Sequence, residues 1–435
     1  MNFLINKFKG YANKPFVRNV AIVGGGSVAA QAIILAFSPI LTRLYSPEAF
    51  GILGVFLATT ALVTTVGSLT YQIAIVLPEK DSDAKAIASL SIQILMLISV
   101  IVMVILYVFK DPIVSLLQIQ AIYAYLYLIP VYILVSGIHK VAEQWLIRKE
   151  KFKKKAKVGI IKAMLVNSIK TGVGLFKPIA LVLIIISIIG QLLYAVMLSW
   201  GELNMRKFGL SRFKNSEFFD YSSMKSMAIR YHDFPLYRAP QAIIGSIASN
   251  TPILILTSFF GPASAGFYAI GKKALIAPVG LISSAVGQVF YPRVAKALNN
   301  GENIQKLLIK ATLGLGVVGI VPFGTIILFG PPLFEFVFGS DWVVAGEYAR
   351  WLSFWLYFEF VKTAAIQTIP VIRLQGFFLF YTVISTPLRG GVFILSAILL
   401  DNVIQSLALF CLISGAFSLL LTVWIIYKSK NPINE

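Results

Sequence analysis

The amino-acid sequence predicts an all-α integral membrane protein of twelve transmembrane helices, arranged as two parallel-repeat six-helix lobes. Three observations lead to this fold class. Of the 435 residues, 58% are hydrophobic and only 13% are charged, whereas a soluble domain is about half apolar and about a quarter charged. The apolar residues gather in twelve long runs, and one short motif occurs once in each half of the chain.

Each apolar run is long enough to cross a bilayer, which takes about 20 mostly apolar residues. Strands of a membrane barrel would instead be about ten residues long and would alternate in polarity. The predicted spans are Asn19–Leu41, Phe50–Leu77, Ala86–Phe109, Ile113–Ile138, Val158–Phe176, Pro178–Trp200, Tyr231–Phe259, Ala265–Val289, Leu307–Phe329, Ala345–Ile369, Phe377–Leu400 and Val403–Tyr427.

Lysine and arginine set the orientation of the spans. Of the 38 basic residues, 27 fall in connections on the side of the N-terminus and 3 in connections on the other side. Cytoplasmic connections carry the excess of basic residues in membrane proteins. We therefore expect a multi-pass membrane protein with both termini in the cytoplasm. The N-terminal segment before the first span is expected to form a short amphipathic helix on the inner membrane surface.

The recurring motif predicts two related halves. LTRLYSPEAFG at Leu41–Gly51 aligns with LTSFFGPASAG at Leu256–Gly266, with a constant offset of 215 residues. The predicted domains are an N-terminal lobe over 1–200, a basic cytoplasmic linker over 201–230 and a C-terminal lobe over 231–435. Two such bundles suit an alternating-access transporter whose substrate binds between them. The alternative is that Pro-Gly turns recur between helices by chance.

Eight basic residues remain inside the predicted spans, where a charge at the bilayer centre costs at least about 2.5–3.5 kcal/mol. They are Arg238, Lys170, Lys273, Arg389, Lys272, Lys162, Arg350 and Lys362. We predict that they line a cavity that binds an anionic substrate. Two alternatives remain open: Lys162, Lys362 and Arg350 lie close enough to span ends to reach the headgroups, and Glu347 and Glu359 stand three residues before Arg350 and Lys362, the spacing of local ion pairs.

Acidic residues are rare in the spans. Glu359 and Asp233 are the acids that could exchange a proton or Na⁺, and pairing with Lys362 or Arg230 is the structural alternative. The sequence predicts no catalytic residue, cofactor or metal site, because it has one cysteine, two histidines and no cluster of metal-ligand spacing.

Several motifs carry a family resemblance. LTRLYSPEAFG, YQIAIVLPEKDSDA, EQWLIRKEKFK and the stretch from PILILTSFFG to YPRVAKA resemble the polysaccharide biosynthesis export proteins, the O-antigen and capsule oligosaccharide flippases of the MATE-like superfamily. The resemblance implies a protein of the inner (plasma) membrane that moves undecaprenyl-diphosphate-linked oligosaccharide from the cytoplasmic to the periplasmic leaflet through a cationic cavity. It also implies membrane lipids as partners, together with a polymerase and a glycosyltransferase of the same pathway.

Three other function classes fit the residues less well. A multidrug exporter of the same architecture would need acids in its cavity to bind cationic drugs, and a scramblase would leave the interior cations without a role. A membrane glycan polymerase or ligase would need a large outer loop or outer acids, whereas the longest outer connection, Gly330–Val344, has only Glu335 and Asp341. Nucleic acid is not an expected partner, because the net charge of +20 follows from the membrane topology.

Overall fold

The computed structural model describes residues 15–200 and 221–430. The predicted amphipathic N-terminus and most of the predicted linker lie outside these residues. Within them every regular element is a helix, and eight helices are long and apolar enough to cross a membrane. The chain divides into two compact units. The first unit consists of the chain up to Tyr45 together with Val55–Asn250, and the second consists of Ser46–Gly54 together with the chain from Thr251 onward.

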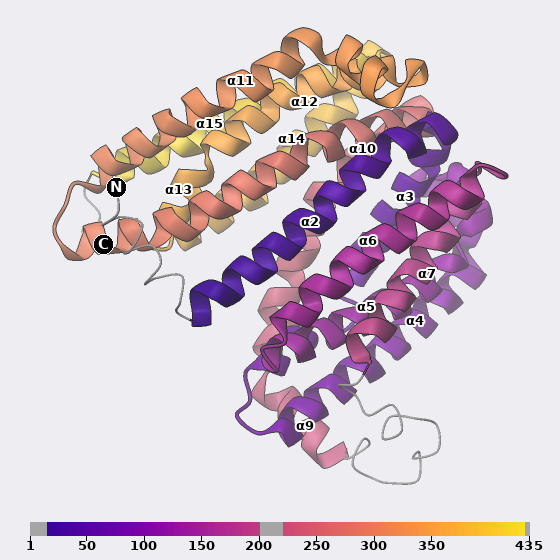
Figure 1. Cartoon of the computed structure of the whole chain (residues 1–435), viewed down its shortest axis with the longest axis horizontal. Coiled ribbons are helices and arrows are strands. Elements are labelled where there is room, and N and C mark those ends of the chain that lie inside the picture. Colours follow the sequence, from indigo (N-terminus) through magenta and orange to yellow (C-terminus); the bar gives the residue numbers. More distant parts are fainter. Residues whose placement is uncertain (1–14, 201–220, 431–435) are drawn as a thin grey trace. The chain divides into compact units, whose positions relative to one another are not determined.

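The first unit is a bundle of long helices with short helical connections. Its elements are α2 (Pro15–Leu44), most of α3 (Pro47–Thr64), η1 (Tyr71–Val76), α4 (Asp81–Leu117), η2 (Gln120–Tyr125), α5 (Leu128–Arg148), α6 (Phe152–Gly174), α7 (Ala180–Ser199), α9 (Tyr221–Arg230), η4 (Phe234–Arg238) and the start of α10 (Ala239–Asn299). Figure 1 shows α2 running alongside α6. The two helices approach closely because Gly26 has no Cβ, which would overlap Ala156.

The core of the first unit joins four elements. Ile75 of η1, Ile87 of α4, Trp145 of α5 and Met227 of α9 belong to one buried apolar cluster. This cluster fixes η1 and α9 against α4 and α5, although η1 and α9 are too short to be stable alone.

The second unit contains the start of α3, most of α10 and all later helices. These are α11 (Ile304–Phe338), η5 (Ser340–Trp342), α12 (Val343–Val361), α13 (Thr363–Thr368), α14 (Gln375–Leu400) and α15 (Val403–Lys428). Helix α12 packs against both α11 and α15, and α14 packs against α15. The fully buried Trp342 contacts the rings of Phe50 and Phe267 edge-on.

The two copies of the recurring motif contact each other reciprocally within the second unit. A Cβ added at Gly51 would overlap the carbonyl oxygen of Pro262, and a Cβ added at Gly266 would overlap the carbonyl oxygen of Pro47. Each glycine therefore lies against the proline of the other copy. Such self-complementary contact is the pattern of a two-fold relation, and small residues permit it between membrane helices.

Three long helices contain one non-helical residue each, and all three residues fall at or between predicted span ends. Phe109 lies inside α4, Gly261 inside α10 and Phe329 inside α11. Gly261 has φ 82° and ψ 170°, a conformation that glycine adopts without steric cost. Helix α10 is thus two helical segments, and the break separates the predicted spans Tyr231–Phe259 and Ala265–Val289.

Two predicted span boundaries are wrong. The segment Ile113–Ile138 is not one helix, because α4 ends at Leu117, Gln118 is left-handed with φ 49°, and α5 begins at Leu128. The segment Phe50–Leu77 is also interrupted, since α3 ends at Thr64. Hydropathy reports which residues tolerate lipid, so it does not mark where a helix ends within an apolar run.

Candidate functional site

A pocket of about 340 Å³ lies within the first unit and brings together polar residues from four segments. This volume is in the range of small-molecule binding sites. The lining residues are Thr65, Thr70, Gln72, Ile73, Lys140, Glu143, Gln144, Arg238 and Ala242. Two of them are basic and one is acidic, which is an uncommon set for a largely apolar helix bundle.

One wall of the pocket is the segment between α3 and α4. Leu69 and Thr70 are consecutive left-handed residues with φ 48° and 61°, a conformation that few non-glycine residues adopt. Thr70 Oγ1 donates a hydrogen bond to the carbonyl of Phe234 at 3.0 Å, and Tyr71 OH donates one to the carbonyl of Ala228 at 3.0 Å. These bonds hold the strained turn against α9 and η4, and η4 contributes Arg238 to the pocket lining.

Lys140 projects from the middle of α5. Its Nζ donates a hydrogen bond to the carbonyl oxygen of Thr64 at 3.1 Å, where α3 ends. A helix end leaves carbonyl groups without intrahelical partners, so a lysine is a suitable donor. The sequence-based topology assigned Lys140 to a cytoplasmic connection, whereas the structure places it in a helix and in the pocket.

Arg238 is the last residue of η4, a π-helical segment. Single π turns occur frequently at functional sites. Within the described part of the chain, Arg238 has no hydrogen bond or ion pair, and its side chain is exposed on the pocket wall. The pocket therefore contains one cation that has no hydrogen-bonded or ion-paired partner among the described residues.

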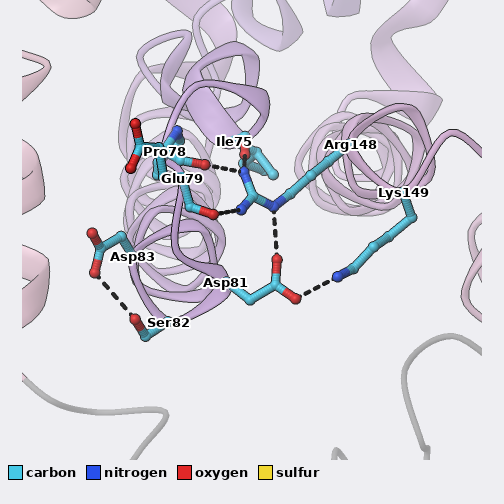
Figure 2. Close-up of polar contacts among 8 residues, drawn as sticks. All are labelled: Ile75, Pro78, Glu79, Asp81, Ser82, Asp83, Arg148 and Lys149. Atoms are coloured by element: carbon cyan, nitrogen blue, oxygen red, sulfur yellow. Dashed lines mark hydrogen bonds and ion pairs between the residues drawn. The ribbon is translucent and has the colours of Figure 1, made fainter.

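The connection that forms the pocket wall is held at its far end by Arg148, as Figure 2 shows. The Arg148 guanidinium donates hydrogen bonds to the carbonyls of Ile75, Pro78 and Glu79 at 3.2, 2.5 and 3.1 Å, and to Asp81 Oδ1 at 3.1 Å. The Arg148 side chain is only 9% exposed. The neighbouring Lys149 also contacts Asp81, whose side chain is half exposed.

Lys140, Gln144 and Arg148 occur at intervals of four residues and so lie along one face of α5. Lys140 binds the carbonyl of Thr64, the last residue of α3, and Arg148 binds carbonyls of the segment between α3 and α4. Helical periodicity continued past Ile138 would have predicted this face from the sequence. The predicted end of the span at Ile138 prevented it.

Two predicted substrate-binding lysines of the first unit are absent from the pocket lining and donate hydrogen bonds to neutral side chains. Lys162 Nζ donates a hydrogen bond to Gln191 Oε1 at 2.9 Å and lies 4.4 Å from the centre of the Tyr194 ring. Lys170 Nζ donates one to Ser187 Oγ at 3.0 Å. Each lysine therefore connects α6 to α7.

Two predicted residues of the second unit lie on α10. Lys272 and Lys273 are both partly buried, and the ammonium group of Lys272 lies 5.3 Å from the centre of the Tyr268 ring. A cation over an aromatic face is electrostatically stabilised.

Lys362, which directly follows α12, pairs with the acidic Glu359 of that helix. Lys362 Nζ lies 2.7 Å from Glu359 Oε1, and Ser418 Oγ of α15 donates a hydrogen bond to the same oxygen at 2.6 Å. Glu359 is therefore tied to Lys362, as the structural alternative for this acid expected.

Arg350 forms the second of the local ion pairs. Its Nη1 lies 3.2 Å from Glu347 Oε1, and its Nη2 donates a hydrogen bond to the carbonyl of Leu328 at 3.2 Å. The i,i+3 alternative for Arg350 and Lys362 is thus realised in both cases, and the role of these residues toward substrate stays a prediction.

Arg389 lies on α14 beside aromatic groups. Its Nη2 donates a hydrogen bond to Tyr381 OH at 3.1 Å, and its guanidinium lies 5.3 Å from the centre of the Phe417 ring. The Arg389 Nε atom is buried and has no hydrogen-bond partner. Asp233, the second acid considered for ion coupling, is exposed and lies 3.4 Å from His232 Nε2 rather than beside Arg230.

Of the predicted binding residues, Arg238 alone is among the residues that line the described pocket. Lys140, Glu143 and Gln144 were missed by the sequence reasoning. Within residues 15–200 and 221–430, no group of three or more His, Cys, Asp or Glu side chains could hold a metal ion.

Comparison with protein families gives one match over most of the chain. A family model described as "Polysaccharide biosynthesis protein" matches residues 40–347. The chain is also 22% identical over 311 residues to the succinoglycan biosynthesis transport protein ExoT of Rhizobium meliloti (strain 1021). That match covers 71% of this chain but only 59% of ExoT, so the chain spans less than two thirds of the length of this relative.

Solved structures with the same fold include two membrane transport proteins. The lipid II flippase MurJ in an inward closed conformation has a TM-score of 0.70 at 15% identity, covering 93% of this chain and 89% of MurJ. An inward-facing multidrug resistance MATE family transporter of the MOP superfamily has a TM-score of 0.67 at 13% identity, covering 96% and 99%. At these identities the likeness concerns the fold alone.

Proposed function

The chain belongs to the polysaccharide biosynthesis protein family, and from this we propose that it is a flippase for undecaprenyl-diphosphate-linked oligosaccharide. In this proposal the lipid-linked glycan moves from the cytoplasmic to the periplasmic leaflet of the inner membrane by alternating access. The family match and the transport name of the ExoT relative support a polysaccharide exporter. The MurJ-like fold is compatible with a lipid-linked substrate.

The proposed architecture is twelve spans in two lobes, over 1–200 and 231–435, joined by the linker 201–230, with both termini cytoplasmic. Two observations support it. The break at Gly261 divides α10 into two segments that correspond to separate predicted spans, and the reciprocal contact of Gly51 and Gly266 suits a two-fold relation between repeats. Rocking of such lobes would expose a bound substrate to each side of the membrane in turn.

The observation that carries the proposed function is the presence of Arg238 and Lys140 in one pocket. A diphosphate does not enter hydrocarbon without a partner, because transferring an unpaired charge from water to an apolar environment has a large free-energy cost. Arg238 has a guanidinium without a protein partner in the described residues, and planar guanidinium groups bind phosphate oxygens in pairs. We assign the first phosphate contacts to these two cations, while the polyprenyl chain stays in lipid.

The other predicted cations complete the proposal as contacts for the diphosphate or for acidic sugars. Lys162, Lys170 and Arg389 each donate a hydrogen bond to a neutral side chain, and Lys272 lies over an aromatic ring. These four residues and Lys273 are the ones we would test next. Arg350 and Lys362 are weaker candidates, since each already pairs with a glutamate. Glu359 and Asp233 remain proposed sites of ion coupling, and polymerase and glycosyltransferase of the same pathway remain proposed partners.

Removal of the Arg238 guanidinium tests the proposed function. The full-length protein is reconstituted in liposomes with a labelled undecaprenyl-diphosphate-linked oligosaccharide, and its transfer between leaflets is measured. A hydrogen bond from a charged group contributes about 1.5–3 kcal/mol, so Arg238→Ala should slow transfer by at least about tenfold. Arg230→Ala, a matched loss of charge at the end of α9, should change transfer less than about twofold, as expected for an exposed surface cation.

Two outcomes would contradict the proposal. Wild-type protein that transfers no lipid-linked oligosaccharide would refute the flippase activity. Equal transfer by the Arg238→Ala and Arg230→Ala variants would refute the assignment of the pocket as the phosphate site.

A further inference from the structure

The pocket that contains Lys140 and Arg238 also contains a carboxylate. Glu143 follows Lys140 by three residues on α5, so the two side chains share one helix face, and both line the pocket. The Glu143 carboxylate forms an ion pair with the neighbouring helix α6, where its Oε1 lies 2.7 Å from Lys155 Nζ. The proposed phosphate site thus has its own anion.

We propose that Glu143 is a built-in counter-anion, which competes with the substrate's phosphate groups for Lys140 and Arg238, and that Lys155 sets the strength of this competition. The inference rests on the proposed function and adds to it how an anionic substrate is released. While Lys155 binds the carboxylate, the pocket cations are open to phosphate. When the carboxylate turns toward Lys140, it replaces the phosphate.

Glu143 lies among three lysines: it is ion-paired with Lys155, and it interacts electrostatically with Lys140 and Lys162. The Glu143 and Lys155 side chains are 27% and 23% exposed, so both retain enough contact with solvent to move. In the described residues, the carboxylate of Glu143 is the group that binds the Lys155 side chain. Lys140 donates its hydrogen bond to a neutral carbonyl. An anion that approaches Lys140 would therefore interact with it more strongly than this carbonyl does.

A transport site must bind strongly enough to fill and weakly enough to empty. A pocket with two cations and no acid would retain a diphosphate. The pocket lining itself carries Lys140, Arg238 and Glu143 and so has one positive charge in excess, which is too little to neutralise two ionised phosphate groups. The internal carboxylate therefore allows the bound state to form without making it permanent.

The test measures binding of inorganic diphosphate to the purified full-length protein in nanodiscs of zwitterionic lipid, by titration calorimetry. Glu143→Gln removes the competitor, so the Kd should fall by about tenfold, after allowance for solvent screening. Lys155→Met frees the carboxylate to occupy Lys140, so the Kd should rise by about tenfold. Glu150→Gln, an exposed loss of the same charge at the end of α5, should leave the Kd within about twofold.

The double variant Glu143→Gln/Lys155→Met separates competition from simple electrostatics. If Lys155 acts through Glu143, the double variant should bind diphosphate like Glu143→Gln, within about twofold, since the remaining charge effect is screened. If both charges act only through space, the two effects should cancel and the double variant should bind like the wild type. The latter result would overturn the inference.

A purely structural ion pair between α5 and α6 predicts another pattern. Both single variants would then change binding in the same direction and would lower the unfolding temperature alike, and that outcome also overturns the inference. In liposomes the inference predicts that Glu143→Gln lowers both KM and kcat for lipid-linked oligosaccharide, because substrate release is slowed.

The inference and the proposed function fail separately. If wild-type protein binds diphosphate and Arg238→Ala weakens the binding, the pocket is a phosphate site whatever Glu143 does. If Glu143→Gln then leaves the Kd unchanged, only the counter-anion is refuted. If wild-type protein binds no diphosphate, both the assignment of the pocket and the counter-anion are refuted.

Discussion

Replacing Arg148 by alanine removes one side chain that holds three backbone carbonyls and a carboxylate. The carbonyls of Ile75, Pro78 and Glu79 lie in the connection that forms the pocket wall, and Arg148 is 9% exposed. Hydrogen bonds from a charged donor contribute about 1.5–3 kcal/mol each. Because the three carbonyl bonds share one guanidinium, we take the lower end and expect about 3–5 kcal/mol of lost stability in Arg148→Ala.

The bond to Asp81 adds little to this magnitude, since the Asp81 side chain is 50% exposed and exposed ion pairs contribute about 0–1 kcal/mol. Lys149→Ala is therefore a matched control: it removes a cation bound to the same carboxylate (Figure 2) but to no carbonyl of the connection. We expect Lys149→Ala to cost less than about 1 kcal/mol.

Two measurements on protein in detergent check this prediction for Arg148. Equilibrium unfolding compares Arg148→Ala, Arg148→Lys and Lys149→Ala, and the lysine variant should recover only part of the loss, because an ammonium group lacks the planar fork of donors. Hydrogen exchange should increase across residues 71–80 in Arg148→Ala and stay unchanged in Lys149→Ala. Equal stability losses in the two alanine variants would refute the reasoning.

Two further predictions concern other parts of the chain. Gly51→Ala should destabilise the protein by about 3 kcal/mol or more, because the new Cβ would overlap the carbonyl oxygen of Pro262. The control Gly324→Ala places its Cβ where no other atom lies close and should be neutral or slightly stabilising. Equal unfolding temperatures of the two variants would contradict this prediction. Outside the spans, the Arg293 guanidinium donates a hydrogen bond to Glu302 at 2.6 Å and holds the pKa of that carboxyl below its usual range. The stabilisation from this ion pair is present at neutral pH and is lost as pH falls through the lowered pKa of Glu302. Arg293→Gln should therefore raise the pKa of Glu302 toward its ordinary value in an NMR titration. An unchanged pKa would refute the pairing.

The sequence by itself was sufficient for the features that depend on composition and on spacing along one helix. Long apolar runs predict membrane helices because lipid accepts only such segments, and the membrane class and the family were confirmed. The ion pairs of Arg350 and Lys362 with acids three residues earlier are visible in the sequence, since helix geometry alone brings i and i+3 together.

Tertiary structure decided which groups meet from distant positions. Lys140 belongs to the pocket because α5 extends past the apolar run and because α3 ends at Thr64, whose carbonyl accepts its hydrogen bond. The extension of α5 leaves no glycine or proline mark, and the turn after α3 contains Gly67 but places the non-glycine residues Leu69 and Thr70 in the left-handed conformation.

The pairing of Glu143 with Lys155 joins two helices, and no spacing within one helix predicts it. The physical reason is the same in each case. Hydropathy and periodicity describe one helix in its solvent, whereas the partner of a polar side chain depends on where other helices end and which faces they present.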